Sequence, residues 1–177
     1  MTNPVLEAIG ARRSNRAYKN EQLSKEQLDA ILKAAVQAPS ARNAQPWHFT
    51  AVQNKALLEE INQEVSKNLN EDVGDIFYAA PTVIFISAET QGQTPRWARL
   101  DSGIAVYAIA MAAHSLGLGT VILGMPEPAL AGPRAKHFAQ LLKFPDNHEF
   151  AVAIAIGYAL DTKEAHPVKP NKIDYVV

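Results

Sequence analysis

Hydrophobic residues recur every three to four positions in several stretches of the chain, which is the spacing of one face of an α-helix. The clearest case covers residues 24–38, where Ser24 and Gln27 form the pattern of a capping box at the start. The apolar positions that follow at helical spacing are Leu28, Ile31, Leu32, Ala35 and Val36. The pattern therefore predicts an amphipathic helix that ends near Ala38.

Three further stretches have helical spacing. They are residues 4–11, residues 55–65 and residues 97–116, of which the last is the longest. Between Tyr107 and Ala113 this long stretch is apolar on nearly every face. Because a helix that is apolar all round must be buried on all sides, either it is the central helix or a second subunit covers it.

Two segments have weaker helical patterns. Residues 131–144 predict one helix, opened by Gly132 and Pro133. Residues 68–80 are interrupted by Gly74, and we expect there a loop that leads into a short helix.

Strand patterns alternate with these helices. Residues 47–52 alternate between apolar and polar side chains, and residues 81–87 are rich in Val, Ile and Phe. Residues 120–123 predict a third strand after the long helix. Residues 149–158 are apolar without alternation, which predicts a central strand. Four strands interleaved with helices predict one three-layered α+β domain over residues 1–177.

The last part of the chain is a polar tail that begins at Asp161 and contains Pro167 and Pro170. It closes with the largely apolar residues 173–177. An apolar end on a proline-stiffened arm has little reason to exist unless it docks on something. We expect it to lie on a partner subunit, and the alternative is a strand on the chain's own sheet.

Charge and composition restrict the class of function. The 177 residues include 17 Lys and Arg against 18 Asp and Glu, so the chain is nearly neutral. This argues against a general nucleic-acid binder, which has a broadly basic surface. There is no cysteine, which removes disulfides, thiolate metal ligands and a cysteine nucleophile. The apolar runs are shorter than the ~20 residues of a membrane span, and the first residues lack a signal-peptide pattern, so we expect a cytoplasmic protein.

Residues 38–49 form the most distinctive stretch of the sequence. Pro39 and Pro46 fix their own φ angles and prevent the preceding helix from continuing. Trp47, a large aromatic residue at a strand start, is expected in the core. The polar side chains between the prolines are Ser40, Asn43 and Gln45. A rigid polar loop between a helix and a strand suits ligand binding.

A basic cluster at residues 12–16 places three guanidinium groups and a hydroxyl close together. Guanidinium groups bind phosphate oxygens in a bidentate manner, and the Ser14 hydroxyl can add a further hydrogen bond. The cluster follows a helix end, so no helix N-terminus assists it. The alternative interpretation is a solvated basic turn.

Other kinds of site find little support in the sequence. Gly117 and Gly119 do not make a dinucleotide fingerprint, because Ile122 stands at the third glycine position and the motif follows a helix. The five histidines show no metal-ligand pairing, and no GxSxG elbow is present. We interpret Asp101, expected at the start of the long helix, as structural, because a carboxylate is favourable there.

Three motifs taken together resemble those of the nitroreductase family of flavin mononucleotide (FMN) enzymes. They are RRSNRAY at residues 12–18, APSARNAQPWHF at residues 38–49 and SLGLGTVILG at residues 115–124. The resemblance extends over nearly the whole chain. It implies a nitroreductase-like α+β fold, with a central mixed β-sheet flanked by helices and a C-terminal arm that extends onto the partner of a homodimer.

The resemblance also implies roles for the matching residues. Arg12 and Ser14 would hold the phosphate and ribityl chain of FMN, and Arg16 would lie beside the pyrimidine edge of the flavin ring. Main-chain N–H groups around Gly124 would face the flavin N5 and O4 atoms. In the tail, Lys169 stands where the family usually has an arginine that returns to the phosphate, and lysine lacks the planar fork.

Other matching residues would approach FMN from the neighbouring subunit. Pro39 and Ser40 would contact the cofactor, and Asn43 would form a hydrogen bond near it or across its own loop. An asparagine that the family often has near the flavin corresponds in place to Asn70 or Asp72. The candidate cofactor-binding residues, with Arg13 at a variable position of the family, are Arg12, Arg13, Ser14, Arg16, Pro39, Ser40, Asn43, Leu123, Gly124 and Lys169.

The implied activity is that of an FMN-dependent NAD(P)H oxidoreductase. NADH or NADPH would pass a hydride to flavin N5, and a nitroaromatic, a quinone or a similar electron-poor acceptor would then be reduced, in a ping-pong sequence. Because the cofactor holds the chemistry, no catalytic side chain is expected. The alternatives are a flavin-binding protein without turnover, or a different reaction on the same fold, such as dehalogenation or ene reduction. Residues 68–74 and 89–96 are the candidate gates of the substrate pocket.

Overall fold

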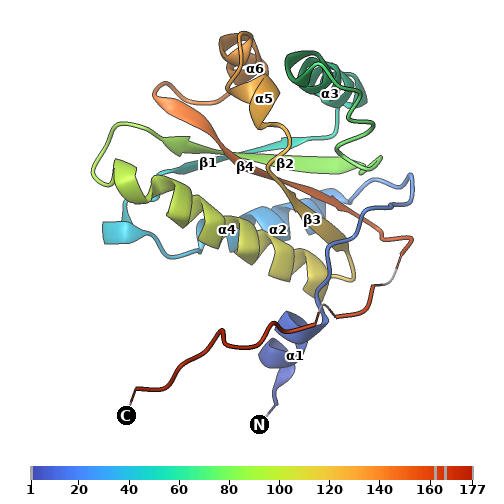
Figure 1. The fold of residues 1–177 in the computed structure, drawn as a ribbon, viewed down its shortest axis with the longest axis vertical. Helices are drawn as coiled ribbons and strands as arrows, with labels where there is room; N and C mark the ends of the chain where they lie inside the picture. The colour runs from blue at the N-terminus through green and yellow to red at the C-terminus, as the bar shows by residue number, and fades with distance from the viewer. Residues whose placement is uncertain (1, 162, 166, 177) are drawn as a thin grey trace.

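The computed structural model describes residues 2–161, 163–165 and 167–176. Figure 1 shows a β-sheet between two layers of helices. In chain order, the elements are α1 (Pro4–Ala11), α2 (Lys25–Val36), the 3-10 helix η1 (Ala41–Asn43), β1 (Trp47–Val52), α3 (Lys55–Leu69), β2 (Thr82–Glu89), α4 (Pro95–Ser115), β3 (Gly119–Leu123), α5 (Glu127–Leu130), α6 (Ala135–Leu141) and β4 (His148–Gly157).

The sheet has the strand order β1-β2-β4-β3. All three pairings between these strands are antiparallel. An isolated parallel bridge between Ser14 and Thr120 adds the N-terminal part of the chain to the edge of β3. The predicted four strands are confirmed, and the strand without alternation, β4, does lie inside the sheet.

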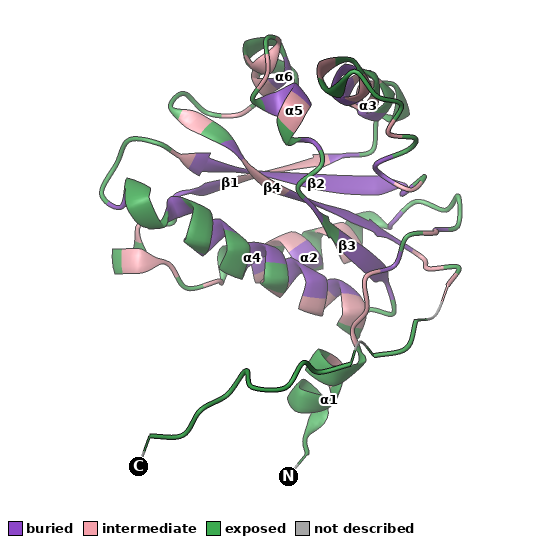
Figure 2. Cartoon of the chain, viewed as in Figure 1, coloured by how far each residue is buried: buried purple, intermediate pink, exposed green. Residues whose placement is uncertain are grey.

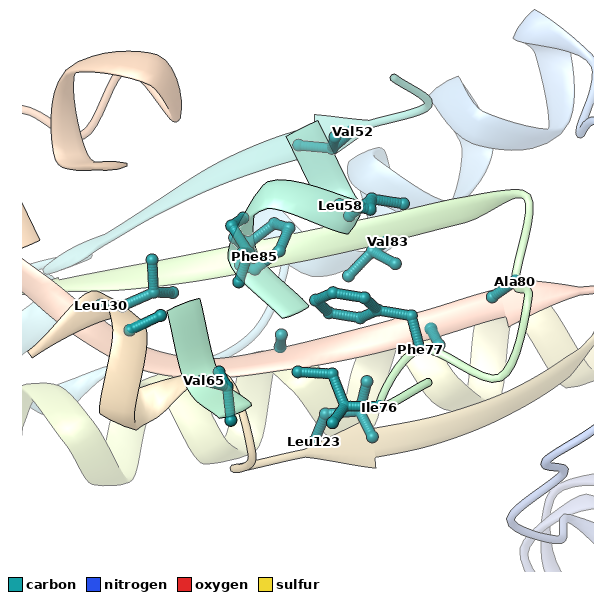
Figure 3. Close-up of a cluster of buried hydrophobic side chains, with 14 of the residues drawn as sticks. Val52, Leu58, Val65, Ile76, Phe77, Ala80, Val83, Phe85, Leu123 and Leu130 are labelled. Carbon is teal, nitrogen blue, oxygen red and sulfur yellow. The ribbon is translucent and has the colours of Figure 1, made fainter. Parts of the chain in front are cut away.

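Each face of the sheet has its own hydrophobic core. One core lies beneath α3, α5 and α6, where Leu58, Phe77 and Phe85 pack together (Figure 3). The other core lies between the sheet and the helices α2 and α4, and it contains Ile31 and Ile109. Figure 2 shows the buried residues concentrated along the sheet and on the helix faces turned toward it. The predicted three-layer α+β architecture is confirmed.

The predicted capping box at the start of α2 is present. The Ser24 hydroxyl accepts a hydrogen bond from the Gln27 N–H (3.2 Å), and the Gln27 side chain accepts one from the Ser24 N–H (3.0 Å). These two bonds satisfy N–H groups that have no partner inside the helix. Ser24 and Gln27 therefore mark where α2 begins, as the sequence predicts.

The short helix predicted near the end of residues 68–80 is wrong. The carboxylate of Asp75 accepts hydrogen bonds from the main-chain N–H groups of Phe77 (2.9 Å) and Ala79 (2.5 Å), which closes a tight turn. Tyr78 and Ala79 have φ angles of 58° and 55°, outside the helical region. An aspartate that bonds to nearby main chain competes with a helix, and here the turn prevails.

The single helix predicted for residues 131–144 is confirmed as α6, although it is shorter than predicted, and a separate short helix, α5, ends just before this region. The break between them contains Gly132 and Pro133. A Cβ atom on Gly132 would lie 2.3 Å from the carbonyl oxygen of Pro128, so the chain packs too closely there for another residue. Pro133 has no N–H to donate into a preceding turn.

The long helix α4 is not a central helix. It packs one face against the sheet and α2, and in the described chain its other face is open to solvent (Figure 2). The exposed large side chains on this open face of α4 are Trp97, Leu100, Ile104 and Tyr107. The expectation that a second subunit covers this face of α4 stays a prediction.

Both ends of the described chain project from the body of the protein. None of the residues of α1 is buried, and the tail after residue 160 runs along one side without entering the sheet (Figures 1 and 2). The expectation that the tail docks on a partner subunit stays a prediction. Among the helices of the described residues, none is long and apolar enough to cross a membrane.

Candidate functional site

Residues 13–19, here called the 13–19 segment, run along the outer edge of β3. The Asn15 N–H donates a hydrogen bond to the carbonyl of Thr120 (2.9 Å), next to the Ser14–Thr120 bridge. On its other side, Tyr18 forms an antiparallel bridge with Ala159 at the start of the tail. The segment thereby brings the basic cluster to the first residues of β3.

Beyond this contact, the outer edge of β3 is open. Main-chain polar groups in an antiparallel strand point alternately to its two sides. Because the Thr120 carbonyl points away from β4, the main-chain groups of Ile122 and the N–H of Gly124 point the same way, whereas Leu123 pairs with Ala153 of β4. The Gly124 carbonyl accepts a hydrogen bond from the Glu127 N–H (3.0 Å). From Thr120 to Gly124 this edge is about 13 Å long at the usual rise of a strand. It can accept the polar edge of an elongated ligand.

Ile122 and Gly124 are also accessible. The side chain of Ile122 is 42 % exposed, although the rest of β3 is buried, and Gly124 is exposed just after the strand. No other described atom lies within 4 Å of the position where a Gly124 Cβ would be. A flat group could therefore approach the main chain at Gly124 and lie against Ile122.

Two arginines of the basic cluster, Arg12 and Arg16, flank the Ser14 that pairs with the first part of β3. Arg12 is half-buried at the C-terminal end of α1, and its guanidinium forms no hydrogen bond or ion pair with another described side chain or carbonyl. The guanidinium carbon of the exposed Arg16 lies 5.9 Å from the centre of the Tyr78 ring. A half-buried cation without an anionic partner is suited to bind a phosphate.

Arg13 is bound to main-chain groups. Its guanidinium donates hydrogen bonds to the carbonyls of Lys163 (3.1 Å), Gly10 (2.6 Å) and Arg12 (2.8 Å). These bonds hold α1, the 13–19 segment and the tail together. The proposed contact of Arg13 with a cofactor stays a prediction.

The loop after α2 is held in a strained conformation. Arg42, Asn43 and Gln45 have φ angles of 54°, 55° and 49°, each of which costs roughly 1–3 kcal/mol in a residue other than glycine. The loop is closed by Gln45, whose N–H donates to the Ser40 hydroxyl (3.0 Å) and whose side-chain amide donates to the Asn43 side chain (3.0 Å). Strain of this kind persists where the surrounding structure imposes one conformation.

Asp101 anchors this strained loop from α4. Its carboxylate oxygens both lie 3.2 Å from the N–H of Ala41, and its side chain is buried. The expected position at the start of the long helix is wrong, because α4 begins at Pro95 and Asp101 lies in its second turn. Trp47 is buried as expected.

The loop and the 13–19 segment lie at opposite ends of α4 (Figure 1). Ser40 lies in a shallow hollow with Trp97, Leu100 and Asp101, whereas Ser14 pairs with a residue just after the C-terminal end of the helix. From Asp101 to Ser115 the helix axis extends about 21 Å. Within one protomer, the two motifs therefore cannot meet at a single small ligand.

The other predicted site residues lie apart from these two groups. Lys169 is exposed on the projecting tail. The side chain of Leu123 is buried, so only its main chain can lie near a ligand. Asn70 ends α3 in a left-handed conformation, and the Asp72 carboxylate accepts a hydrogen bond from the Gly74 N–H (3.0 Å).

Two residues of this region were missed by sequence reasoning. Ile122 lies on the open edge strand β3 with an exposed side chain. Asn15 lies against the same strand, because its N–H donates a hydrogen bond to the Thr120 carbonyl. The alternation of side chains within residues 120–123 signals that Ile122 and Thr120 share a face. No sequence pattern signals that β3 is an edge strand.

Comparison with known proteins indicates the same family as the three sequence motifs. The sequence profile of the Nitroreductase family matches residues 9–158. A protein of Archaeoglobus fulgidus, provisionally named NADH dehydrogenase/NAD(P)H nitroreductase, is 34 % identical over 163 residues, which cover 90 % of this chain and 87 % of the relative.

Solved structures are similar over the whole chain. A nitroreductase with bound FMN from Desulfitobacterium hafniense DCB-2 superimposes with a TM-score of 0.92 at 36 % identity, covering 100 % of both chains. A nitroreductase with bound FMN from Bacteroides fragilis NCTC 9343 gives a TM-score of 0.90 at 32 % identity, covering 99 % of this chain and 100 % of the other. With its motifs, its fold and these similarities in agreement, the chain belongs to the nitroreductase family.

Proposed function

We propose that this protein is an FMN-dependent NAD(P)H oxidoreductase that reduces nitroaromatics, quinones or similar electron-poor acceptors. It would act as a homodimer, with residues 1–177 forming one FMN-binding domain in each protomer. The observation that supports this proposal best is the open edge of β3, with Ser14 and Arg12 at its start and the accessible Gly124 at its end.

The residues present fit FMN at this edge. Arg12 offers a guanidinium to a phosphate, and Ser14 offers a hydroxyl beside it. Along the edge, the exposed Ile122 offers an apolar surface to a flat ring, and the Gly124 N–H can donate a hydrogen bond to a polar ring atom. Arg16 would stabilise negative charge at the pyrimidine side of the ring.

Bound FMN would supply the redox chemistry, because it can take a hydride from NAD(P)H and pass electrons to an acceptor. The protein would bind, orient and shield the reactants. The charges of Arg12 and Arg16 favour an anionic ligand at this edge. The buried Asp101 carboxylate is bound to the loop main chain, which supports its structural role.

Two features of the protomer support the proposed homodimer. The apolar face of α4 is open to solvent, and the loop that carries Ser40 lies at the opposite end of α4 from Ser14. If two copies pack α4 against α4 in opposite directions, Pro39 and Ser40 of each come beside the β3 edge of its partner. A twofold interface of this kind pairs one surface with itself.

The experiment that tests the proposal is a flavin titration followed by reduction. We expect a yellow protein that bleaches with NADH or NADPH without oxygen and regains colour when a nitroarene or quinone is added. A yellow protein that NADH and NADPH do not bleach would favour a flavin-binding protein without turnover. A colourless protein that takes up no added FMN would contradict the proposal.

A further inference from the structure

Residues 158–160, which connect β4 to the tail, run antiparallel to the 13–19 segment. The Lys19 N–H donates a hydrogen bond to the Tyr158 carbonyl (2.8 Å), and the Leu160 N–H donates one to the Ala17 carbonyl (2.9 Å). The 13–19 segment therefore has β3 on one side and residues 158–160 on the other. It acts as an irregular strand between them.

Two side chains continue this contact beyond the main-chain hydrogen bonds. The Asn15 amide donates to the carbonyl of Asp161 (2.9 Å) and to its carboxylate (3.2 Å). The Arg13 guanidinium donates to the carbonyl of Lys163 (3.1 Å). Residues two apart on the 13–19 segment thus hold residues two apart on the tail, which is the spacing of side chains on one face of a strand.

Asn15 is fixed on every side. It is buried, its carbonyl accepts a hydrogen bond from the Tyr18 hydroxyl (2.7 Å), and its N–H is bound to Thr120. The Asn15 side chain also packs closely against Gly119: a Cβ atom at position 119 would lie 2.9 Å from the Asn15 Cγ and Oδ1 atoms. Burial raises the pKa of Tyr18, so its hydroxyl keeps the proton that it donates to Asn15.

Asn15 also stands between Ser14 and Arg16, the residues proposed to contact the cofactor. Because their main chain is continuous with that of Asn15, the hydrogen bonds to Asp161 restrict the positions of both. We infer that Arg13 and Asn15 are positioning residues, which couple the docking of the C-terminal tail to the formation of the FMN-binding turn. This inference rests on the proposed function.

The coupling has a reciprocal consequence. If a docked tail improves FMN binding, then bound FMN must stabilise the docked tail by the same factor. Lys169 lies further along the same tail, so its approach to the cofactor would depend on the same two clamps. Tail docking can be measured without turnover, in the protein without FMN.

Cleavage by trypsin after Lys163 measures the docking directly, because the carbonyl of that peptide bond accepts the hydrogen bond from Arg13. Cleavage there removes residues 164–177, which mass spectrometry identifies. We expect Arg13→Gln and Asn15→Ala to raise this cleavage rate and the Kd for FMN roughly three- to tenfold, as for the loss of one or two hydrogen bonds. Cleavage after Lys172, which lies outside the clamped part of the tail, is the internal control.

A matched control variant is Gln140→Ala on the exposed surface of α6, far from the tail. It should leave both the cleavage rate after Lys163 and the Kd for FMN unchanged. In the unaltered protein, added FMN should slow cleavage after Lys163 without slowing cleavage after Lys172.

Exchanging the amide of Asn15 with the carboxylate of Asp161 distinguishes a positioning role of Asn15 from general destabilisation of the fold. Asn15→Asp places two carboxylates against each other and should weaken docking more than Asn15→Ala. Adding Asp161→Asn restores a donor and an acceptor, so the double variant should recover part of the tail protection and of the FMN affinity. The other groups that face Asp161, namely Arg16, Tyr18 and Lys163 (Nζ at 3.5 Å), are the same throughout the series.

The possible failures are distinct. If the unaltered protein binds FMN and the variants at Arg13 and Asn15 are cleaved and bind FMN as it does, the inference is overturned and the proposed function stands. If the unaltered protein does not bind FMN, the proposed function fails. If both single variants lose folding stability without any recovery in the Asn15→Asp/Asp161→Asn protein, the clamps are only structural and the inference is likewise overturned.

Discussion

At the scale of single residues, charge and hydrogen-bond capacity decide the candidate site. Arg12 and Arg13 are neighbours of the same type, yet their surroundings differ. Arg13 is bound to three carbonyls, whereas the half-buried guanidinium of Arg12 has no such bond within the described chain. The sequence predicts a cation at both positions, and only the fold assigns one to the main chain and leaves the other for a ligand.

Replacing Arg12 should weaken FMN binding. Arg12→Ala removes the guanidinium that we propose to bind the phosphate, so the Kd for FMN should rise roughly 10- to 100-fold, on the order of 1.5–3 kcal/mol. Arg12→Lys keeps the charge without the planar fork and should lose less. Quenching of flavin fluorescence during titration measures both. An Arg12→Ala protein with the affinity of the unaltered chain would show that the phosphate lies elsewhere.

Replacing Gly119 should destabilise the fold. A Cβ atom in Gly119→Ala would lie 2.7 Å from the Ala159 Cβ and 2.9 Å from Asn15, so the tail start and the 13–19 segment must shift. Overpacking of this kind costs about 1–3 kcal/mol. Urea denaturation measures the loss in the free energy of unfolding. Gly10→Ala in α1, where no described atom lies within 4 Å, is the control and should not be destabilised.

At the scale of elements, a polar contact joins α3 to the start of α6. The Glu60 carboxylate accepts hydrogen bonds from Arg134 (2.6 Å) and His137 (2.9 Å). The bonds from His137 and Arg134 hold the pKa of Glu60 below its ordinary value of 4.5. A carboxylate whose pKa is lowered by folding stabilises the protein above its unfolded pKa, and this contribution is lost as the pH falls through the folded pKa.

The contact should therefore affect how the free energy of unfolding depends on pH in acid. As the pH is lowered from 4.5, the free energy of unfolding of the unaltered protein should fall more steeply than that of Glu60→Gln. Urea denaturation at several pH values measures the two slopes. Glu59→Gln, one residue earlier on α3, should keep the slope of the unaltered protein. Equal slopes for the unaltered and Glu60→Gln proteins would show that solvent screens this contact.

The strongly patterned elements were predictable, whereas of the two weakly patterned segments one gave the predicted helix with shorter bounds and the other did not. The capping box fixed the start of α2, and continuous apolar sequence identified β4 as central. The turn at Asp75 depends on local side-chain hydrogen bonds that compete with a helix. The later start of α6 goes with the close packing of Gly132 against Pro128 and the distant Asn68. Spacing alone does not report such competition.

At the scale of the whole molecule, the proposed homodimer depends on the open face of α4. The double variant Leu100→Glu/Ile104→Glu places two charges on that face and should convert the dimer into a monomer, because burial of an unpaired charge is costly. Sedimentation velocity measures the change. FMN affinity should fall with it, since the loop that carries Ser40 would then be absent from the partner's site.

A charge added elsewhere serves as the control for this variant. Gln140→Glu on the exposed surface of α6 should leave the oligomeric state unchanged. If Leu100→Glu/Ile104→Glu stays dimeric and keeps its flavin, another surface forms the interface. The α4 face would then have to be explained without the shared site.

The sequence by itself determined the elements and the chemical groups of this protein. Amphipathic spacing, two prolines and three arginines are local properties, and they predicted four strands, a rigid loop and a basic cluster suited to a phosphate. Together with the order of its motifs, they were enough to indicate the nitroreductase family.

Only the tertiary structure decided which of these groups lie together. Ser14 meets β3 through pairing across more than 100 residues, and the Ser40 loop ends at the opposite end of α4, although it is closer to Ser14 in sequence. The same folding made β3 an edge strand, exposed Ile122 and turned Arg13 toward the tail. These outcomes depend on strand order and packing, which are set by the summed burial of many distant residues and have no counterpart in a local pattern.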